Sequence, residues 1–183
     1  MLLGPDDPLD FRPRRILING SSGGGKTTLA AALATDLDLP HTEIDALFHG
    51  AGWVPRAEFL DDVTRLAAEP EWVTEWQYDV ARPILLPRCD LMVWLNTARP
   101  VAMWRVTRRT LRRRLRREEL WNGNVEGPLH GVLTDPEHII RWAWSSHPHA
   151  AARVEQVLRE RPELPVVRLR TPDEVARWRE RLA

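Results

Sequence analysis

The sequence predicts an α/β domain in which helices cover both faces of a five-stranded parallel sheet. Short apolar runs alternate with amphipathic stretches along the chain, an order that is typical of right-handed βαβ units. One run, residues 90–96, is almost continuously apolar, as expected of a strand that is buried on both faces of a parallel sheet. The length of 183 residues suits one domain with one sizeable core.

Each element of this domain can be placed along the chain from its local pattern. The strands are expected over residues 15–19, 41–47, 71–76, 90–96 and 165–170. Helices are expected from about residue 27, over 56–68, in much of 79–87, over about 99–117, from 134 to about 160, and from 171 onward. Thr134 and Thr171 each precede a glutamate by three residues, which predicts capped helix starts. Residues 1–13 are expected to form a loose leader and residues 14–183 a single domain.

Composition narrows the class of protein. The formal net charge is zero, so no overall field favours nucleic acid or a membrane as a partner. The single cysteine, Cys89, excludes an internal disulfide and a cysteine-rich zinc site. The N-terminal segment lacks the apolar stretch of a signal peptide, and no apolar run approaches the roughly 20 residues needed to span a bilayer. Together these features predict a cytoplasmic protein.

A glycine-rich segment follows the first expected strand and matches the pattern G-x-x-x-x-G-K-[ST] at Gly20, Gly25, Lys26 and Thr27. Glycines let the backbone curl so that successive N–H groups point at an anion, and the helix that follows adds partial positive charge there. We expect Lys26, the only lysine of the chain, to reach the β- and γ-phosphates of ATP, and Thr27 to bind Mg²⁺. The alternative is a glycine-rich turn without a ligand; the strand before it and the helix after it favour the phosphate loop. The expected contact set is Gly20, Ser21, Ser22, Gly23, Gly24, Gly25, Lys26, Thr27 and Thr28.

Further segments carry a resemblance to a known family. They are IDALFHGAGWVPRAEF, EWVTEWQYD, DLMVWLNTARPVAMWRVTRRTLRR and ELWNGNVE. With the glycine loop they resemble the adenylate-kinase-like P-loop NTPases, and more narrowly the bacterial DNA topology modulation proteins. The resemblance implies a nucleoside- and nucleotide-kinase-like sheet with a small helical lid at about 109–136, and phosphoryl transfer from ATP to a small acceptor. The Asp-Gly-x-Pro-Arg signature of adenylate kinases is absent, which argues against AMP as the acceptor.

Two carboxylates stand at expected strand ends, where ligands gather in parallel sheets. Glu75 closes the third strand, at a position where the resembling proteins commonly have Asp-Gly-Asn-Tyr, and we expect it to bind a magnesium-bound water or to act as the acceptor base. Asp45 ends the second strand and is expected to contact the acceptor; each carboxylate has the alternative of being an ordinary cap or a solvated loop residue. For Arg82, the resemblance suggests an acceptor or phosphate contact, and the alternative is a surface arginine.

The helix over 99–117 is rich in arginine. Its Arg105, Arg109, Arg112 and Arg116 share one face by helical spacing. The resemblance implies that lid arginines clamp the donor phosphates, with Arg109 catalytic and Arg105 beside it. The alternatives are a solvated face paired with nearby glutamates, or a patch that binds a DNA backbone. On another face of this helix, Trp104, Leu111 and Leu115 are expected to pack against the rest of the protein. The same resemblance places the turn at Thr171 and Pro172 beside the adenine.

Nine tryptophans are many for this length. The expected core members are Trp72, Trp94, Trp142, Trp144 and Trp178. Packing is also favoured over ligand stacking for Trp53 and Trp76. Altogether the sequence favours a Mg²⁺- and ATP-dependent kinase for a small molecule or nucleotide. The alternative is an ATP-binding or ATPase regulatory protein that associates with nucleic acid and has no small acceptor.

Overall fold

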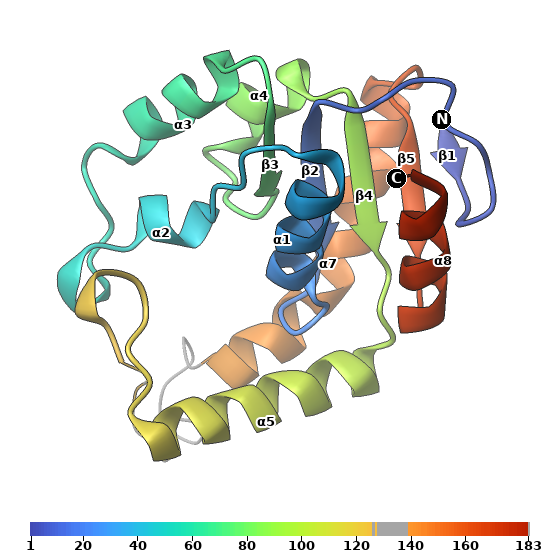
Figure 1. Ribbon diagram of the computed structural model, residues 1–183. Helices are drawn as coiled ribbons and strands as arrows, with labels where there is room; N and C mark the ends of the chain where they lie inside the picture. The colour runs from blue at the N-terminus through green and yellow to red at the C-terminus, as the bar shows by residue number, and fades with distance from the viewer. Residues whose placement is uncertain (126, 128–138, 183) are drawn as a thin grey trace.

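The computed structural model describes residues 1–125, 127 and 139–182. Five strands form one sheet in the order β1-β5-β4-β2-β3, and every neighbouring pair is parallel. The strands are β1 Leu2–Leu3, β2 Arg15–Gly20, β3 Trp72–Glu75, β4 Leu91–Leu95 and β5 Val166–Leu169. The predicted α/β class with a five-stranded parallel sheet is therefore confirmed (Figure 1).

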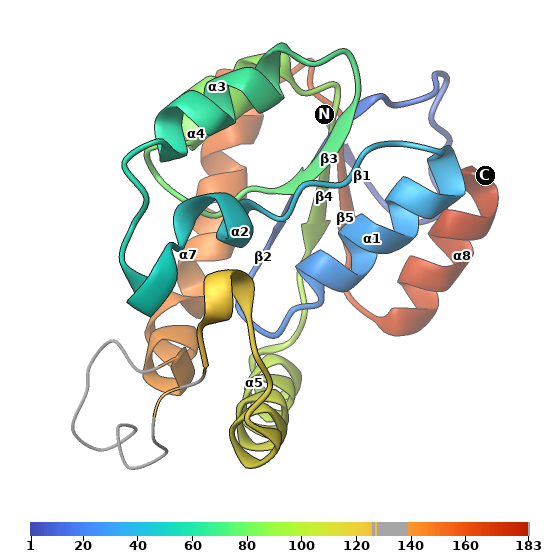
Figure 2. The same ribbon diagram turned by 60° about the vertical axis from the view of Figure 1, so that its left-hand side comes forward.

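Helices lie on both faces of this sheet, and one helix lies across the carboxyl ends of its strands (Figure 2). They are α1 Lys26–Leu37, α2 Ile44–Phe48, α3 Phe59–Ala68, α4 Arg82–Leu85, α5 Arg99–Arg116, α7 Ile139–Glu160 and α8 Pro172–Leu182, with short 3₁₀ turns η1 Ala51–Trp53, η2 Leu86–Arg88 and η3 Trp121–Gly123. The start of α8 is capped as predicted, because Glu174 N donates to Thr171 Oγ1 at 3.2 Å. The helix start predicted at Thr134 lies outside the described residues.

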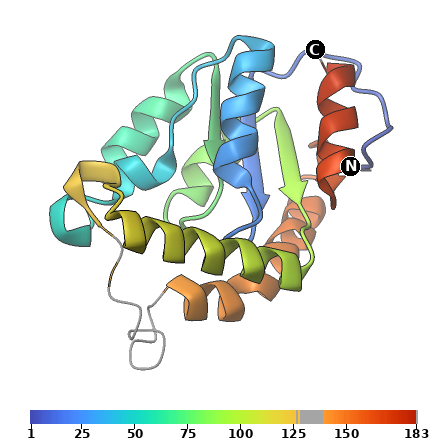
Figure 3. The same cartoon turned by 60° about the horizontal axis from the view of Figure 1, so that its bottom comes forward.

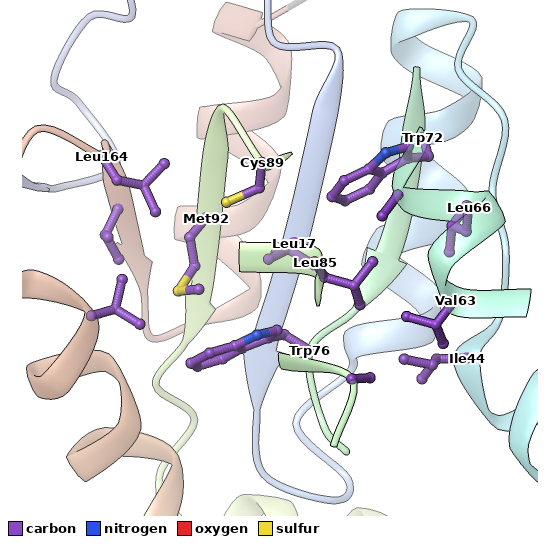
Figure 4. Close-up of a cluster of buried hydrophobic side chains, with 14 of the residues drawn as sticks. Leu17, Ile44, Val63, Leu66, Trp72, Trp76, Leu85, Cys89, Met92 and Leu164 are labelled. Atoms are coloured by element: carbon purple, nitrogen blue, oxygen red, sulfur yellow. The ribbon is translucent and has the colours of Figure 1, made fainter. Parts of the chain in front are cut away.

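Strand alternation divides the core into two layers. Leu17 and Met92 point toward the layer that α3, α4 and α7 cover, while Ile18 and Val93 point toward α1 and α8. Figure 4 shows the first layer, in which Trp72 and Trp76 lie among aliphatic side chains. Burial of the tryptophans predicted to pack is confirmed for Trp72, Trp76, Trp94 and Trp178.

The prediction of a strand over residues 41–47 is wrong. Only His41 makes a bridge, to Val73, and the chain then turns into α2. The carboxylate of Glu75 accepts a hydrogen bond from Ile44 N at 3.1 Å, which satisfies one of the free donors at the helix start. The remaining strand comes instead from the expected leader: Leu2–Leu3 pair with β5, and the Met1 amino group donates to Leu164 O at 2.8 Å.

The packing predicted for the outer face of the arginine-rich helix is also wrong. Helix α5 runs across the carboxyl edge of the sheet (Figure 3), and it buries only the narrow face formed by Ala102, Val106 and Thr110. The opposite face is in solvent, so Trp104, Leu111 and Leu115 are exposed; so are Trp142 and Trp144 on α7. Arginine side chains cover two of these rings instead, with the Arg108 guanidinium 5.3 Å from the Trp104 ring centre and the Arg99 guanidinium 3.6 Å from that of Trp144.

Candidate active site

The glycine-rich segment forms a tight loop between β2 and α1. Gly23 and Gly25 have φ values of 76° and 99°, in the left-handed region that favours glycine. Gly24 N donates to Ser21 O at 3.0 Å, which curls the chain, and Gly25 precedes the first residue of α1. The backbone therefore has the curled form predicted from the motif.

Neighbouring elements hold this loop in place. A Cβ atom on Gly23 would lie 2.4 Å from the carbonyl oxygen of Ala102 in α5, and one on Gly20 would lie 3.1 Å from Leu95 in β4. The Thr97 hydroxyl donates to Gly24 O at 3.2 Å. The loop thus lies between the end of β4 and α5, with too little room for side chains at Gly20 and Gly23.

Lys26 connects the loop to the groups predicted around it. Its Nζ donates to Ser21 O at 3.3 Å. Burial lowers the pKa of Lys26, with Arg109 and Arg153 acting in the same direction and Asp45 and Glu75 against it. Three other predicted catalytic residues, Asp45, Glu75 and Arg109, therefore lie within electrostatic reach of Lys26.

Glu75 is 2% exposed at the end of β3. Burial alone would raise the pKa of this carboxyl, but hydrogen bonding from His41, the Ile44 amide and Thr27 together lowers it. Its Oε1 atom is buried without a partner at hydrogen-bond distance, and His41 Nε2 lies 3.7 Å from it. A carboxylate oxygen of this kind, beside the hydroxyl of Thr27, fits a Mg²⁺ that binds through water, because Mg²⁺ in kinases takes few protein ligands and keeps several waters. His41 was not predicted from the sequence as part of the site.

Asp45 lies in the first turn of α2 rather than at a strand end. Tyr78 Oη donates to its Oδ1 at 2.6 Å, and the Gln77 side-chain amide donates to the same atom. Burial and the charge of Asp45 raise the pKa of Tyr78, so the hydroxyl remains a donor. His49 Nε2 lies 3.2 Å from the same hydroxyl. The role of Gln77-Tyr78 was missed, although their place directly after the third strand was the available signal.

A pair of arginines forms the positively charged side of the site. Arg82 on α4 donates to Gln77 O at 2.8 Å, lies 5.3 Å from the Trp76 ring centre and forms an ion pair with Asp79. Burial and the neighbouring Arg153 lower the pKa of Arg82 to about 10, and burial also lowers the pKa of Arg153. The Nε atoms of both guanidinium groups are buried without a hydrogen-bond partner. An anionic group bound between them would reduce their mutual repulsion.

Arg153 was not singled out from the sequence. It lies on α7, far along the chain from every other group of the site, and no local pattern distinguishes it from the neighbouring surface arginines. Only the position of α7 against β2 and α5 brings it to the loop.

Of the four arginines predicted to share one face of α5, two lie beside the phosphate loop and two do not. The Arg105 guanidinium lies 3.9 Å from where a Cβ of Gly25 would be, so it flanks the loop, as Arg109 does from its effect on Lys26. Arg112 lies 3.5 Å from Glu118, as the alternative of a glutamate-paired face predicts, and Arg116 is exposed. Thr171 and Pro172 follow β5 at the same edge of the sheet and are exposed.

Comparison with solved structures agrees with this fold. The structure of a gluconokinase from Sinorhizobium meliloti 1021 is similar with a TM-score of 0.51 and 18% identity, over 93% of this chain and 92% of that one. A sugar kinase from Janibacter sp. HTCC2649 is similar with the same TM-score and identity, over 92% and 91%. No protein-family model and no curated protein matches the sequence. The loop and the sheet thus define a P-loop nucleotide-binding fold. More particularly, it is the fold of the P-loop kinases. No helix within residues 1–125 and 139–182 is long and apolar enough to cross a membrane.

Proposed function

We propose that this chain is an ATP-dependent kinase that transfers the γ-phosphoryl group to a hydroxyl of a small acceptor bearing an anionic group. The observation that carries the proposal is that Asp45, Glu75, Arg109 and Arg153 all lie within electrostatic reach of Lys26 in the phosphate loop. Kinases of this kind work by positioning phosphates and stabilising charge, and these residue types supply both. The narrower resemblance to the DNA topology modulation proteins remains a hypothesis.

On the donor side, the loop N–H groups and Lys26 would bind the β- and γ-phosphates. Thr27 and Glu75 would hold Mg²⁺, which when bound neutralises charge on the phosphates. Arg105 and Arg109 would stabilise the charge that spreads over the transferring group. The turn at 171–172 would lie against the adenine.

On the acceptor side, Asp45 would take the proton of the attacking hydroxyl. A bond forms between the acceptor oxygen and the γ-phosphorus, the bond from that phosphorus to the bridging oxygen breaks, and ADP leaves. Tyr78 and Gln77 orient one oxygen of Asp45. Their hydrogen bonds fix the direction in which this carboxylate presents its other oxygen.

The pair Arg82 and Arg153 would hold the anionic group of the acceptor. A carboxylate or phosphate binds guanidinium groups through charge-assisted hydrogen bonds. These are roughly twice as strong as hydrogen bonds between neutral groups. Asp79, which pairs with Arg82 and lies within electrostatic reach of Arg153, has a side chain that is 85% exposed and would be displaced at little cost. The gluconokinase among the similar structures acts, by its name, on gluconate, a hydroxylated carboxylate.

The test is a panel of hydroxylated carboxylates and sugar phosphates, each with its neutral analogue, assayed for stimulated ADP release. Arg153→Gln should raise the KM of the best acceptor by about 10- to 100-fold, the value of a hydrogen bond to a charged group. Arg159→Gln, an exposed arginine on the same helix, is the matched control and should change nothing. Equal activity on neutral and anionic acceptors would contradict the anion site. ATP hydrolysis that no acceptor stimulates would favour the regulatory alternative.

A further inference from the structure

The segment after α5, residues 120–125, forms a compact turn that we call the lid loop. It lies within the small helical lid expected at about 109–136. Leu120 N donates to Asn124 O at 2.7 Å, and Glu119 and Val125 form an antiparallel bridge. Asn122 and Gly123 both have left-handed backbone conformations, with φ of 55° and 77°. The lid loop therefore has a defined shape of its own, and it lies against α2 and η1 (Figure 2).

Asn124 joins the lid loop to residues 49–54, which we call the acceptor loop. The residue is 4% exposed although it lies in a surface turn. Its Nδ2 donates to Gly50 O and to Trp121 O, each at 2.8 Å, and its Oδ1 accepts from Trp53 N at 3.0 Å. Two carbonyls face the nitrogen and one amide faces the oxygen, so only an amide side chain in this orientation satisfies all three groups.

The acceptor loop is closed by its own hydrogen bond from Gly50 N to Val54 O at 2.7 Å, and the lid loop holds Trp53 within it. Trp53 has φ of 62°, a conformation that bulky side chains rarely adopt. Its backbone N–H is held by Asn124, and its indole Nε1 donates to Val125 O at 3.1 Å. Strained residues of this kind persist where the surroundings fix them from several sides, and here both hydrogen bonds come from the lid loop.

A second line of contacts runs from the lid loop to Asp45. The Trp121 indole donates to Glu43 Oε2 at 2.8 Å, and its ring stacks on His49 with centres 6.2 Å apart. Glu43 and His49 immediately flank α2, whose first turn carries Asp45. His49 and Asp45 share the hydroxyl of Tyr78. The lid loop thus touches both ends of the helix that presents the acceptor carboxylate.

We propose that Asn124 is a positioning residue that shapes the acceptor side of the site, so that docking of the lid loop and completion of the acceptor site are a single event. The catalytic meaning of this rests on the proposed kinase function, through the role of Asp45. We expect ATP binding not to depend on it, because the side-chain hydrogen bonds of Asn124 and Trp121 stay within the lid loop or reach residues 43–53, and not the phosphate loop.

The isosteric variant Asn124→Asp tests the proposal. It keeps the acceptor atom for Trp53 N but turns the donor nitrogen into an oxygen that faces two carbonyls. Val125→Asp adds the same charge on the next residue, which is 45% exposed and meets Glu119 and Trp53 through its backbone, and it is the matched control. The first readout is hydrogen exchange of the Trp53 amide by NMR, which should be at least 10-fold faster in Asn124→Asp. The second is kinetic: the KM for acceptor should rise about 10-fold or more, with the Kd for ATP unchanged.

The outcomes separate cleanly. Unchanged exchange at Trp53, or faster exchange with unchanged acceptor KM and kcat, would overturn the proposal. If Asn124→Asp fails to fold, which exchange at the β4 amides would reveal, Trp121→Phe removes the Glu43 hydrogen bond while keeping an aromatic ring beside His49, and should give a smaller effect in the same direction. If the wild-type chain transfers phosphate to no acceptor, the proposed function fails by itself, and exchange at Trp53 alone decides whether the lid loop holds the acceptor loop.

Discussion

Gly23 offers a test of how closely α5 is packed on the phosphate loop. Gly23→Ala would place a methyl group 2.4 Å from Ala102 O and 2.6 Å from Val106 Cγ2, so α5 or the loop must move by more than half an ångström. Gly52 is the matched control, because its φ of 68° is as unfavourable for alanine but no atom lies within 4 Å of the new methyl group. We expect Gly52→Ala to cost about 1–2 kcal/mol from backbone strain alone, and Gly23→Ala to cost roughly 1–3 kcal/mol more from overpacking.

Thermal unfolding followed by circular dichroism measures this difference. For a domain of this size the extra cost corresponds to a Tm that is roughly 2–12 °C lower for Gly23→Ala than for Gly52→Ala. ATP titration should show weaker binding only for Gly23→Ala, because α5 carries Arg105 and Arg109 toward the loop. Equal Tm values together with equal ATP affinity would refute the packing of α5 against Gly23.

Three further predictions concern the lid, the acceptor side and the donor base. Arg109→Ala should lower turnover by about 100-fold or more with a smaller effect on ATP binding, while Arg116→Ala, exposed on the same helix, should not; intact turnover with lost salt-dependent DNA binding would favour the nucleic-acid alternative. Burial lowers the pKa of His49 below its usual 6.5. The unfolded chain therefore binds this proton at a higher pH than the folded chain does, and stability falls as the pH drops below 6.5. A Tm loss between pH 7.5 and 5.5 that is as large in His49→Gln as in the wild-type protein would contradict this. A nucleotide-bound structure should place adenine beside Thr171, and adenine more than one loop away would exclude that role.

The phosphate loop could be predicted because its chemistry lies in consecutive residues. Glycines at 23 and 25, the lysine and the following helix are local features, and the backbone adopts the conformations that the motif requires. The parallel sheet followed from apolar runs in the same way. Helix α5 was also placed to within a residue, because its pattern is long and uninterrupted.

What the sequence did not predict depends on contacts between distant residues. The apolar residues of 41–47 follow neither a strand nor a helix period clearly. The chain turns into α2 there, where the buried carboxylate of Glu75 on β3 accepts a hydrogen bond from the Ile44 amide. Arg153 enters the site through the packing of α7, and Asn124 acquires its role only where the lid loop meets the acceptor loop. The helical spacing of Trp104 and the leucines predicted a buried apolar face. Spacing shows which residues share a face, but it does not show whether another element covers that face.

The central claim is that Lys26 and its neighbours transfer phosphate from ATP to a small anionic acceptor. The most direct measurement is to follow γ-labelled ATP with purified wild-type protein and the best acceptor of the panel, and to locate the label by chromatography. We predict label in the acceptor, and loss of that transfer together with strongly weakened ATP binding in a folded Lys26→Ala variant. Label found only in inorganic phosphate, at a rate that acceptor does not change, or transfer that persists in Lys26→Ala, would contradict the claim.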